Sequence, residues 1–429
     1  MPHQPIYYPE DRLPIRKLIP MGIQHVVAMF GATVLAPILM GFNPQVAVFF
    51  SGIGTLLFLA FTRFKVPSYL GSSFAFIGPV LAVTAGAPDR ISEALFGIAG
   101  AAVLYALAGA ATIRWGAGWI DRLMPPLVTG TVVAIIGLNL SASSIANMVN
   151  GTFTISTTGD LKNLAIALVT FFTAALVSIF LRGFVRLLPI LIGVVTGYLT
   201  AAVLGMLDPS ALAAIGSAAW IGLPQFQTPS VSWHALLVIA PVFVVLVAEN
   251  KGHISAISGF MGRDLNPHLG RAFLGDAVAT FVSAMGGGTP QTTYAENMGV
   301  MAITKVFAIG NFVVASIVAI LMGLCPKFGA VIQSIPNPVL GGVTLILYGM
   351  IVLMGVKIWV DAKVDFADHR NLVVAGASLI VASGLGTRGL TVYGLNLAGI
   401  ALGTLLAVVL YLALHFKQDP GEASPQPEH

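Results

Sequence analysis

At one point within an otherwise apolar region, the chain reads Gly286-Gly287-Gly288-Thr289-Pro290-Gln291-Thr292-Thr293-Tyr294-Ala295-Glu296. Glycine, proline and hydroxyl-bearing residues are poor helix formers, whereas threonine and tyrosine suit an extended backbone. The stretch therefore predicts a short extended piece followed by a half-helix. Glu296 falls in the first turn of that half-helix, so an acid is expected where a transmembrane segment is interrupted.

The composition around this stretch is that of a membrane protein. Hydrophobic residues make up 57% of the 429 residues and charged residues only 9%, whereas soluble domains carry about 25% charged residues. Apolar stretches of about 18 residues or more follow one another closely, and we predict about fourteen transmembrane segments. The remaining short loops and tails leave no room for a soluble catalytic domain.

The distribution of positive charge predicts the orientation of these segments. The first apolar stretch, from Ile19 to Met40, is too long for the apolar region of a signal peptide, so it is expected to remain as a span. With both termini in the cytoplasm, nearly all lysines and arginines fall on the cytoplasmic side; the exceptions are Arg90, Lys162, Lys327 and Arg388. This is the bias of a protein inserted in the cytoplasmic membrane, and it argues against a nucleic-acid partner.

A second interruption resembles the first. The third predicted span begins Val66-Pro67-Ser68-Tyr69-Leu70-Gly71-Ser72-Ser73-Phe74, and Ser72-Ser73-Phe74-Ala75 matches Thr292-Thr293-Tyr294-Ala295 at a separation of 220 residues. A further pattern agrees, because Pro126, Gly130 and Gly137 match Pro338, Gly342 and Gly349 at a separation of 212. Both separations are close to half the chain, which indicates a tandem duplication.

The duplication predicts the fold class. We expect an all-α polytopic membrane protein with about 14 segments in a 7+7 inverted repeat, and with short strands and half-helices in segments 3 and 10. Backbone groups at membrane depth need partners, so the two extended pieces are expected to pair with each other. The half-helices would then begin side by side, with their free N–H groups directed at one spot. Such a pair of interrupted segments is the typical position of a transporter site.

Few ionisable residues lie within the predicted spans, and each is a candidate for function. Glu249 and His253 are four residues apart and share one face of the eighth span. Glu296 either only complements the helix dipole or takes part in transport. Glu249 and His253 are either a buried structural pair or functional groups, and His25 is either a hydrogen-bonded core residue or a proton carrier.

Enzymatic alternatives fail on spacing. The segment Glu249-Asn250-Lys251-Gly252-His253 lacks the paired histidines of a helical zinc site, and the chain has no phosphate-binding loop or nucleophile elbow. Cys325 is the only cysteine, so a cysteine-based metal site is excluded. We therefore expect neither an enzyme nor a cofactor apart from a co-transported proton.

These residues carry a resemblance to a known family. A signature of an acid or amide, then Asn-x-Gly, four residues, and Thr followed by Arg, Lys or Gly appears as Glu296-Asn297-Met298-Gly299-Val300-Met301-Ala302-Ile303-Thr304-Lys305. Gln24-His25, Gly71-Ser72-Ser73-Phe74-Ala75-Phe76, and Ala248-Glu249 followed by Gly252-His253 also match. The chain resembles the nucleobase–ascorbate transporter family over nearly its whole length, and most closely its bacterial uracil and pyrimidine permeases.

The resemblance implies a division into two domains. Between cytoplasmic tails at 1–17 and 417–429, a core domain would comprise 18–113 and 234–327, and a gate domain 120–207 and 329–416. It further implies symport with protons and a homodimer formed through the gate domains.

The resemblance also assigns residues to the site. By position, Glu249 and Glu296 would bind the base through their side chains, and Phe74 and Ala295 would donate backbone N–H groups. In addition, Tyr294 and Tyr348 would line the pocket, and His253 would approach through water; Phe74 and Tyr294 are either stacking aromatics or packing residues. Proton coupling is expected to involve Glu296, His253, Glu249 and His25.

The expected substrate is uracil or a related pyrimidine nucleobase. The sequence departs from the usual uracil pattern at Ala295, where glycine is usual, and at Asn250-Lys251. Two alternatives remain open at this point: a xanthine or urate permease of the same family, and an anion transporter or channel of related fold.

Overall fold

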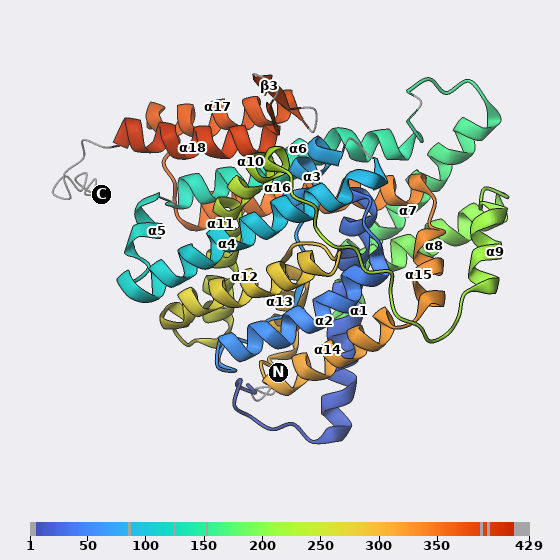
Figure 1. The fold of residues 1–429 in the computed structure, drawn as a ribbon, viewed down its shortest axis with the longest axis horizontal. Helices are drawn as coiled ribbons and strands as arrows, with labels where there is room; N and C mark the ends of the chain where they lie inside the picture. The colour runs from blue at the N-terminus through green and yellow to red at the C-terminus, as the bar shows by residue number, and fades with distance from the viewer. Residues whose placement is uncertain are drawn as a thin grey trace.

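The computed structural model describes residues 6–84, 87–123, 125–151, 153–386, 389–392 and 395–415, and its fold is predominantly helical (Figure 1). Arg388 and the predicted C-terminal tail at 417–429 lie outside the described residues, as do residues 1–5 of the N-terminal tail.

The two halves of the chain begin with a similar run of elements. The first half contains α1 (Ile15–Met40), α2 (Pro44–Phe61), β1 (Leu70–Ser72), the 3-10 helix η1 (Phe74–Phe76), α3 (Ile77–Thr84), η2 (Pro88–Arg90), α4 (Ile91–Trp115), α5 (Gly118–Leu123), α6 (Pro126–Met148), α7 (Thr158–Phe180), η3 (Gly183–Leu187), α8 (Pro189–Val203) and α9 (Pro209–Ser217). The second half contains α10 (Trp233–Ile239), η4 (Ala240–Val242), α11 (Phe243–Met261), η5 (Asn266–His268), α12 (Leu269–Met285), β2 (Gln291–Thr293), α13 (Ala295–Thr304), α14 (Ile309–Gly323), α15 (Pro326–Gln333), α16 (Asn337–Asp361), α17 (His369–Leu385), β3 (Leu390–Val392), β4 (Leu395–Leu397) and α18 (Gly399–His415). In each half, a strand and a short helix follow the first two long helical segments.

Strands β1 and β2 occupy the two interruptions and pair with each other. The pairing is antiparallel, with Gly71 opposite Thr292. Two further backbone bonds extend the ladder, because the Ser73 N–H donates to the Pro290 carbonyl at 2.9 Å and the Tyr294 N–H donates to the Tyr69 carbonyl at 3.1 Å. Each strand therefore supplies hydrogen-bond partners to the backbone groups of the other strand that face it.

Side chains of neighbouring helices satisfy the outer edges. The Leu70 N–H donates to Thr55 Oγ1 on α2 at 2.9 Å, and the Gln291 N–H donates to Thr280 Oγ1 on α12 at 3.0 Å. Both strands are completely buried. Unpaired backbone groups are costly away from water, so these bonds make an extended backbone tolerable among apolar helices.

The close approach of the two interruptions requires a glycine at position 71. A Cβ atom there would collide with the ring of Tyr294 and lie 2.6 Å from Thr33 Oγ1. The same tyrosine is fixed across the strands, because its hydroxyl donates to the Ser72 carbonyl at 2.9 Å.

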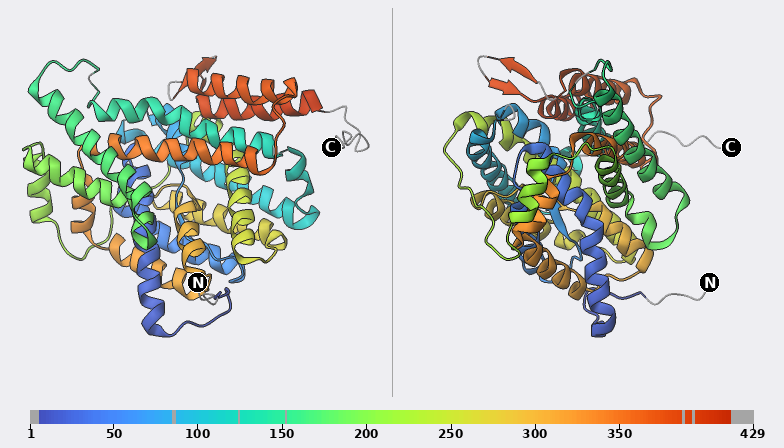
Figure 2. Two further views of the ribbon diagram at one scale, coloured as in Figure 1. Left: turned by 180° about the vertical axis from the view of Figure 1, so that it is seen from behind. Right: turned by 90° about the vertical axis from the view of Figure 1, so that its right-hand side faces the viewer.

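The helices pack in two main sets. One set joins α1 to α14, α2 to α12 and α14, and α4 to α12; the other joins α6 to α16, α17 and α18, and α7 to α8 and α16. Helices α17 and α18 lie side by side along one edge of the molecule, with the β3–β4 hairpin at one end (Figure 2). The division into core and gate domains stays a prediction.

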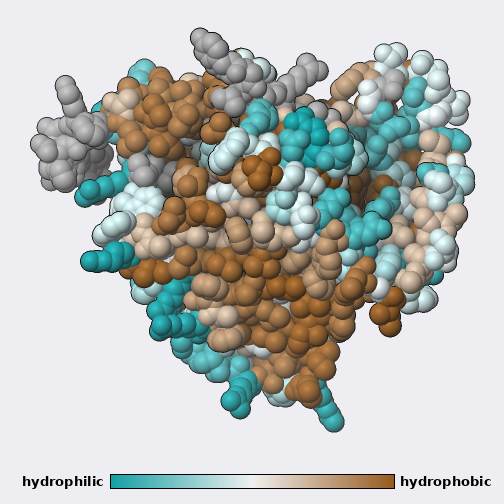
Figure 3. Space-filling model, in the orientation of Figure 1, coloured by the Kyte–Doolittle hydropathy of each residue, from teal (hydrophilic) through white to brown (hydrophobic). Residues whose placement is uncertain are grey.

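The surface is that of a multi-pass membrane protein. Within the described residues, seven helices are long and apolar enough to cross a membrane: Ile15–Met40, Pro44–Phe61, Pro88–Trp115, Pro126–Met148, Thr158–Phe180, Trp233–Met261 and Asn337–Asp361. A broad hydrophobic area crosses the middle of the face shown in Figure 3. On α7, the exposed side chains include Phe172, Leu176, Ile179 and Phe180, which suits contact with lipid.

One predicted boundary is wrong. The predicted core domain ends at 327 and the predicted gate domain begins at 329, but α15 is a separate short helix bent by 81° from α14, and α16 begins only at Asn337. Prolines explain the difference, because Pro326 is the first residue of α15 and Pro338 is the second residue of α16, and proline is favoured in the first turn of a helix. The predicted boundary between 327 and 329 therefore falls inside α15.

The N-terminal segment lies against the loop between α13 and α14. The Tyr7 N–H donates to the Lys305 carbonyl at 3.0 Å, and the Phe307 N–H donates to the Tyr7 carbonyl at 2.7 Å. Arg263 bonds Glu10 at 2.6 Å and thereby lowers the pKa of that carboxyl. This segment connects the end of α13 to the loop after α11.

Gly71→Ala should destabilise the protein by about 1–3 kcal/mol, because its methyl group would overpack the space filled by Tyr294 and Thr33. Thermal unfolding of the purified protein in detergent measures the effect. The control is Gly376→Ala on α17, where nothing lies within 4 Å of an added Cβ. Equal melting temperatures for the two variants would contradict the requirement for glycine at position 71.

Candidate functional site

The candidate site lies where the paired strands end and two short helices begin. η1 starts at Phe74 and α13 starts at Ala295, each directly after its strand. The preceding residues, Ser73 and Tyr294, have extended backbones, and neither makes a side-chain capping hydrogen bond. Since the first N–H groups of a helix have no partner within it, both helix starts offer donors to an oxygen-bearing ligand.

Two acids face this region from different helices. Glu249 lies on α11 and Glu296 in the first turn of α13, and the two carboxyl groups are close enough to interact electrostatically. Glu249 Oε2 is buried and has no hydrogen-bond partner among the described residues. A buried carboxylate oxygen without a partner is costly, so it is suited to accept from a bound N–H group.

Other polar atoms near the strands are also buried and unpaired within the described part of the chain. They include Ser73 Oγ, Gln291 Oε1 and Thr292 Oγ1, and the hydroxyl of Tyr348 on α16 is a further one. Native proteins leave few such atoms unsatisfied, and those that remain usually meet a ligand or water. Their gathering beside two acids and two helix starts indicates a site for a small polar molecule.

Two aromatic rings approach each other across the two helix sets. Phe74 on η1 and Tyr348 on α16 have ring centroids 6.5 Å apart at an interplanar angle of 78°. Tyr294 is placed differently, because its hydroxyl is engaged by the Ser72 carbonyl and its ring packs over Gly71. The rings of Phe74 and Tyr348 therefore contact each other, whereas the Tyr294 side chain is held against the strands by its hydrogen bond to Ser72.

The two histidines have protein partners. His253 Nδ1 lies 2.7 Å from Thr293 Oγ1 in β2. His25 Nδ1 lies 3.1 Å from Asn297 Nδ2, which also donates to the His25 carbonyl at 3.0 Å. Because an amide nitrogen can only donate, His25 Nδ1 accepts, and the ring is neutral with its proton on Nε2. The geometry around His25 favours its interpretation as a hydrogen-bonded core residue.

A third acid, Asp276, lies near the site and was not among the predicted site residues. Asp276 on α12 is completely buried and lies against Asn250 on α11 and Tyr105 on α4. The signal was present, because Asp276 is an ionisable residue within an apolar span.

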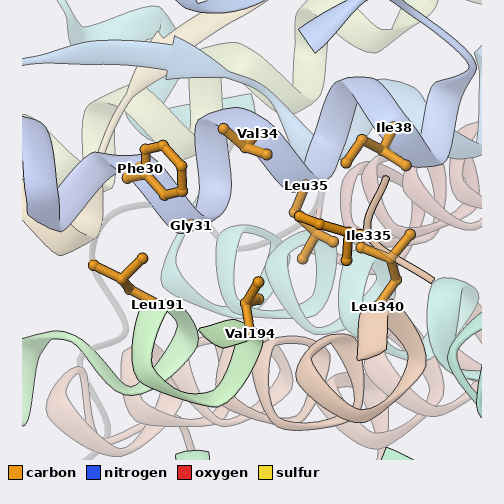
Figure 4. A pocket seen from close by; sticks show the side chains of 9 residues that line it. All are labelled: Phe30, Gly31, Val34, Leu35, Ile38, Leu191, Val194, Ile335 and Leu340. Carbon is orange, nitrogen blue, oxygen red and sulfur yellow. The ribbon is translucent and has the colours of Figure 1, made fainter. Parts of the chain in front are cut away.

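Of two cavities in the described part of the chain, the larger lies within one helix set and the smaller lies between the two sets. One has a volume of about 380 Å³ and is lined by α6 and α16, including Ser141, Ser144, Tyr348 and Gly349. The other holds only about 10 Å³ and is apolar (Figure 4). In that view, side chains of α1 such as Phe30 and Val34 face Leu191 and Val194 of α8. No polar side chain lines the small cavity, so it is a gap in the apolar packing between α1 and α8 and not a binding site for a polar ligand.

A multi-pass helical fold in which two interrupted segments meet beside two acids is that of a membrane transporter. Residues 16–391 match a family model described as Permease family. Together with the relatives below, this match shows that the chain belongs to the nucleobase–ascorbate transporter family.

The most similar relatives compared are bacterial permeases. RutG of Escherichia coli, which is named as a pyrimidine permease, is 43% identical over 95% of this chain and 92% of its own length. A uracil permease of Bacillus caldolyticus is 39% identical over 96% of this chain and 95% of its own. A uracil permease of Escherichia coli is 39% identical over 94% and 92%. The relatives are transporters, and this chain is a transporter and not an enzyme.

Solved structures of more distant proteins share the fold. The murine anion transporter Slc26a9 in its inward-facing state superposes with a TM-score of 0.70 at 14% identity, over 95% of this chain and 70% of that protein. The transmembrane domain of the cyanobacterial bicarbonate transporter BicA gives a TM-score of 0.60 at 16% identity, over 94% and 99%. At these identities the likeness concerns the fold alone.

Thr293→Val should leave the His253 ring without its partner and destabilise the protein by about 1–3 kcal/mol, the usual cost of a buried unpaired polar group. Thr293→Ser keeps the hydroxyl and serves as the matched control. Thermal unfolding in detergent compares the two variants with the parent. A valine variant as stable as the serine variant would show that the bond to His253 contributes nothing.

Proposed function

We propose that this protein imports uracil or a related pyrimidine nucleobase across the cytoplasmic membrane in symport with protons. One observation carries the proposal: the unpaired oxygen of Glu249 and the carboxyl of Glu296 lie beside two uncapped helix starts. The named activities of the similar bacterial permeases support the same substrate class.

The chemistry of the base fits these groups. Uracil is planar and alternates N–H donors with carbonyl acceptors around its ring. Glu249 and Glu296 accept from the N–H groups, while the N–H groups of Phe74 and Ala295 donate to the carbonyls. Phe74 and Tyr348 then border the flat ring, and a base lacking one polar group is rejected because it leaves a buried protein atom unpaired.

The proposed transport cycle uses the two helix sets. We propose fourteen segments in two inverted repeats of seven, with both termini in the cytoplasm and a homodimer formed through the gate domains. The core domain, which carries both acids, moves against the gate domain, which carries Tyr348, and so exposes the site to one side of the membrane at a time. A proton neutralises the loaded site before it crosses, and His253 approaches the base through water.

A purine permease for xanthine or urate is the second candidate. The cavity of about 380 Å³ beside Tyr348 favours it, because it offers space next to the proposed site for a second ring. The methyl group of Ala295 acts in the opposite direction by narrowing the space at the start of α13. A thermal-shift panel of uracil, thymine, xanthine and urate on the purified protein distinguishes the two candidates.

An anion transporter fits less well. Such a site needs positive groups near the helix starts, whereas the residues described there are the acids Glu249 and Glu296. This chain therefore shares its fold with anion transporters, but the residues at its candidate site are acidic and do not suit an anion.

Glu249→Gln should weaken uracil binding about 10- to 100-fold, because a hydrogen bond to a charged group contributes about 1.5–3 kcal/mol and each 1.4 kcal/mol is tenfold in affinity. Equilibrium binding of labelled uracil to purified protein measures this. The control is Glu93→Gln, whose carboxylate lies 3.3 Å from Arg90 at the surface end of α4, and which should bind normally. Unchanged binding in Glu249→Gln contradicts the assignment.

Proteoliposomes should accumulate uracil only when a proton gradient is imposed, because moving one charge through a potential contributes about 2.3 kcal/mol per 100 mV. Glu296→Gln should retain exchange of labelled for unlabelled uracil but lose accumulation, since the glutamine cannot take up a proton. Accumulation that ignores the gradient, or that persists in Glu296→Gln, rules out proton coupling through this acid.

A further inference from the structure

A cluster of three polar side chains lies next to the candidate site, where α11 packs against α4 and α12. It comprises Tyr105 on α4, Asn250 on α11 and Asp276 on α12, and each side chain is completely buried. Asn250 follows Glu249 directly in the chain, so the cluster connects a site-bearing helix to two neighbouring helices.

The cluster is joined through one oxygen of Asp276. Asn250 Nδ2 donates to Asp276 Oδ2 and lies 2.9 Å from the Tyr105 hydroxyl. The Tyr105 hydroxyl lies 3.5 Å from the same carboxyl oxygen and 3.4 Å from the Leu246 carbonyl. Both groups that contact Asp276 are neutral, so neither offsets a negative charge.

Two oxygens in the cluster are left over. Asp276 Oδ1 and Asn250 Oδ1 are both buried, and neither has a hydrogen-bond partner among the described residues. The amide of Asn250 and the carboxyl of Asp276 are already joined by the bond from Nδ2 to Oδ2, and the Oδ1 atom is the second polar atom of each group. As an ionised aspartate and an amide, these two oxygens would both be acceptors with no donor between them.

One proton resolves this mismatch. A protonated carboxyl carries an O–H donor, and the orphan amide oxygen of Asn250 is an acceptor. A proton on Asp276 Oδ1 would supply the donor that Asn250 Oδ1 lacks, would close a cyclic acid–amide pair, and would remove a charge that is costly to bury. If the amide is turned over, the same single proton is still needed between the two facing oxygens.

The charge of the surrounding groups favours the same state. The titratable groups that interact with Asp276 are Glu249 on α11 and Tyr105 on α4. An ionised Asp276 would repel Glu249, the acid that is proposed to accept from the base. A neutral Asp276 leaves the negative charge of α11 at the site itself.

We propose that Asp276 is a proton-bearing carboxyl that pairs with the amide of Asn250, and that this neutral pair positions Glu249 toward the substrate. The pair links α11 to α12 through a hydrogen bond, and the bond from Asn250 to Tyr105 links α11 to α4. Asp276 thus acts as a positioning residue without touching the base. The positioning role rests on the proposed function of Glu249, whereas the protonation of Asp276 does not.

Infrared spectroscopy of the purified protein near neutral pH tests the protonation directly. The carbonyl band of a protonated carboxyl should be present in the parent protein, persist in Glu249→Gln, and disappear in Asp276→Asn. Asn250→Leu keeps Asp276 but removes its amide partner, so the band should shift to higher frequency; this variant preserves the test if Asp276→Asn does not fold. A spectrum that contains no band dependent on Asp276 or Asn250 overturns the proposal.

Uracil binding tests the positioning role. Asp276→Leu breaks the pair and should weaken binding at least tenfold, whereas Asp276→Asn rebuilds a cyclic amide–amide pair and should restore the affinity to within about threefold of the parent. Binding equally poor in both variants contradicts the pairing. If the parent protein binds no uracil while the infrared band is present, the proposed substrate fails and the protonated pair stands.

Discussion

The antiparallel pairing of Leu70–Ser72 with Gln291–Thr293 is the interaction on which the rest of this structure depends. Extended backbone within a membrane is tolerated only where its N–H and C=O groups find partners. Here each strand supplies those partners to the other, and Thr55 and Thr280 supply the outer ones. One helix begins at each end of this two-stranded ladder, η1 at Phe74 and α13 at Ala295, and Glu296 lies in the first turn of α13.

Because acids lie beside the paired strands, binding of the substrate and the charge of the site depend on each other. Like charges repel strongly in a medium of low dielectric constant, so Glu249, Glu296 and Asp276 are not expected to be ionised together. The start of α13 favours negative charge on Glu296 through the helix dipole. The Asn250 pair would make Asp276 neutral. The proposed coupling to protons then follows from the same arrangement that binds the base.

Much of this architecture was accessible from sequence because the decisive signals are local. Composition predicted a multi-pass helical protein, and the runs around Gly71 and Pro290 marked the two interruptions. The boundary between the predicted core and gate domains was placed inside α15 because the apolar pattern continues across that helix, where only prolines mark the bend. The partners of His25 and Asp276 come from helices distant in the sequence, so spacing along one helix could not reveal them. Tyr294 was expected in the pocket, but its bond to Ser72 depends on the pairing register.

A structure of the purified protein with uracil bound, determined by cryo-electron microscopy, is the most direct test of the central claim. The base should lie beside Phe74 and Tyr348, with a ring N–H within hydrogen-bond distance of the Glu249 carboxylate and a carbonyl oxygen facing the first N–H groups of α13. Density for uracil away from the paired strands, or a base that leaves Glu249 Oε2 without a partner, would contradict the account.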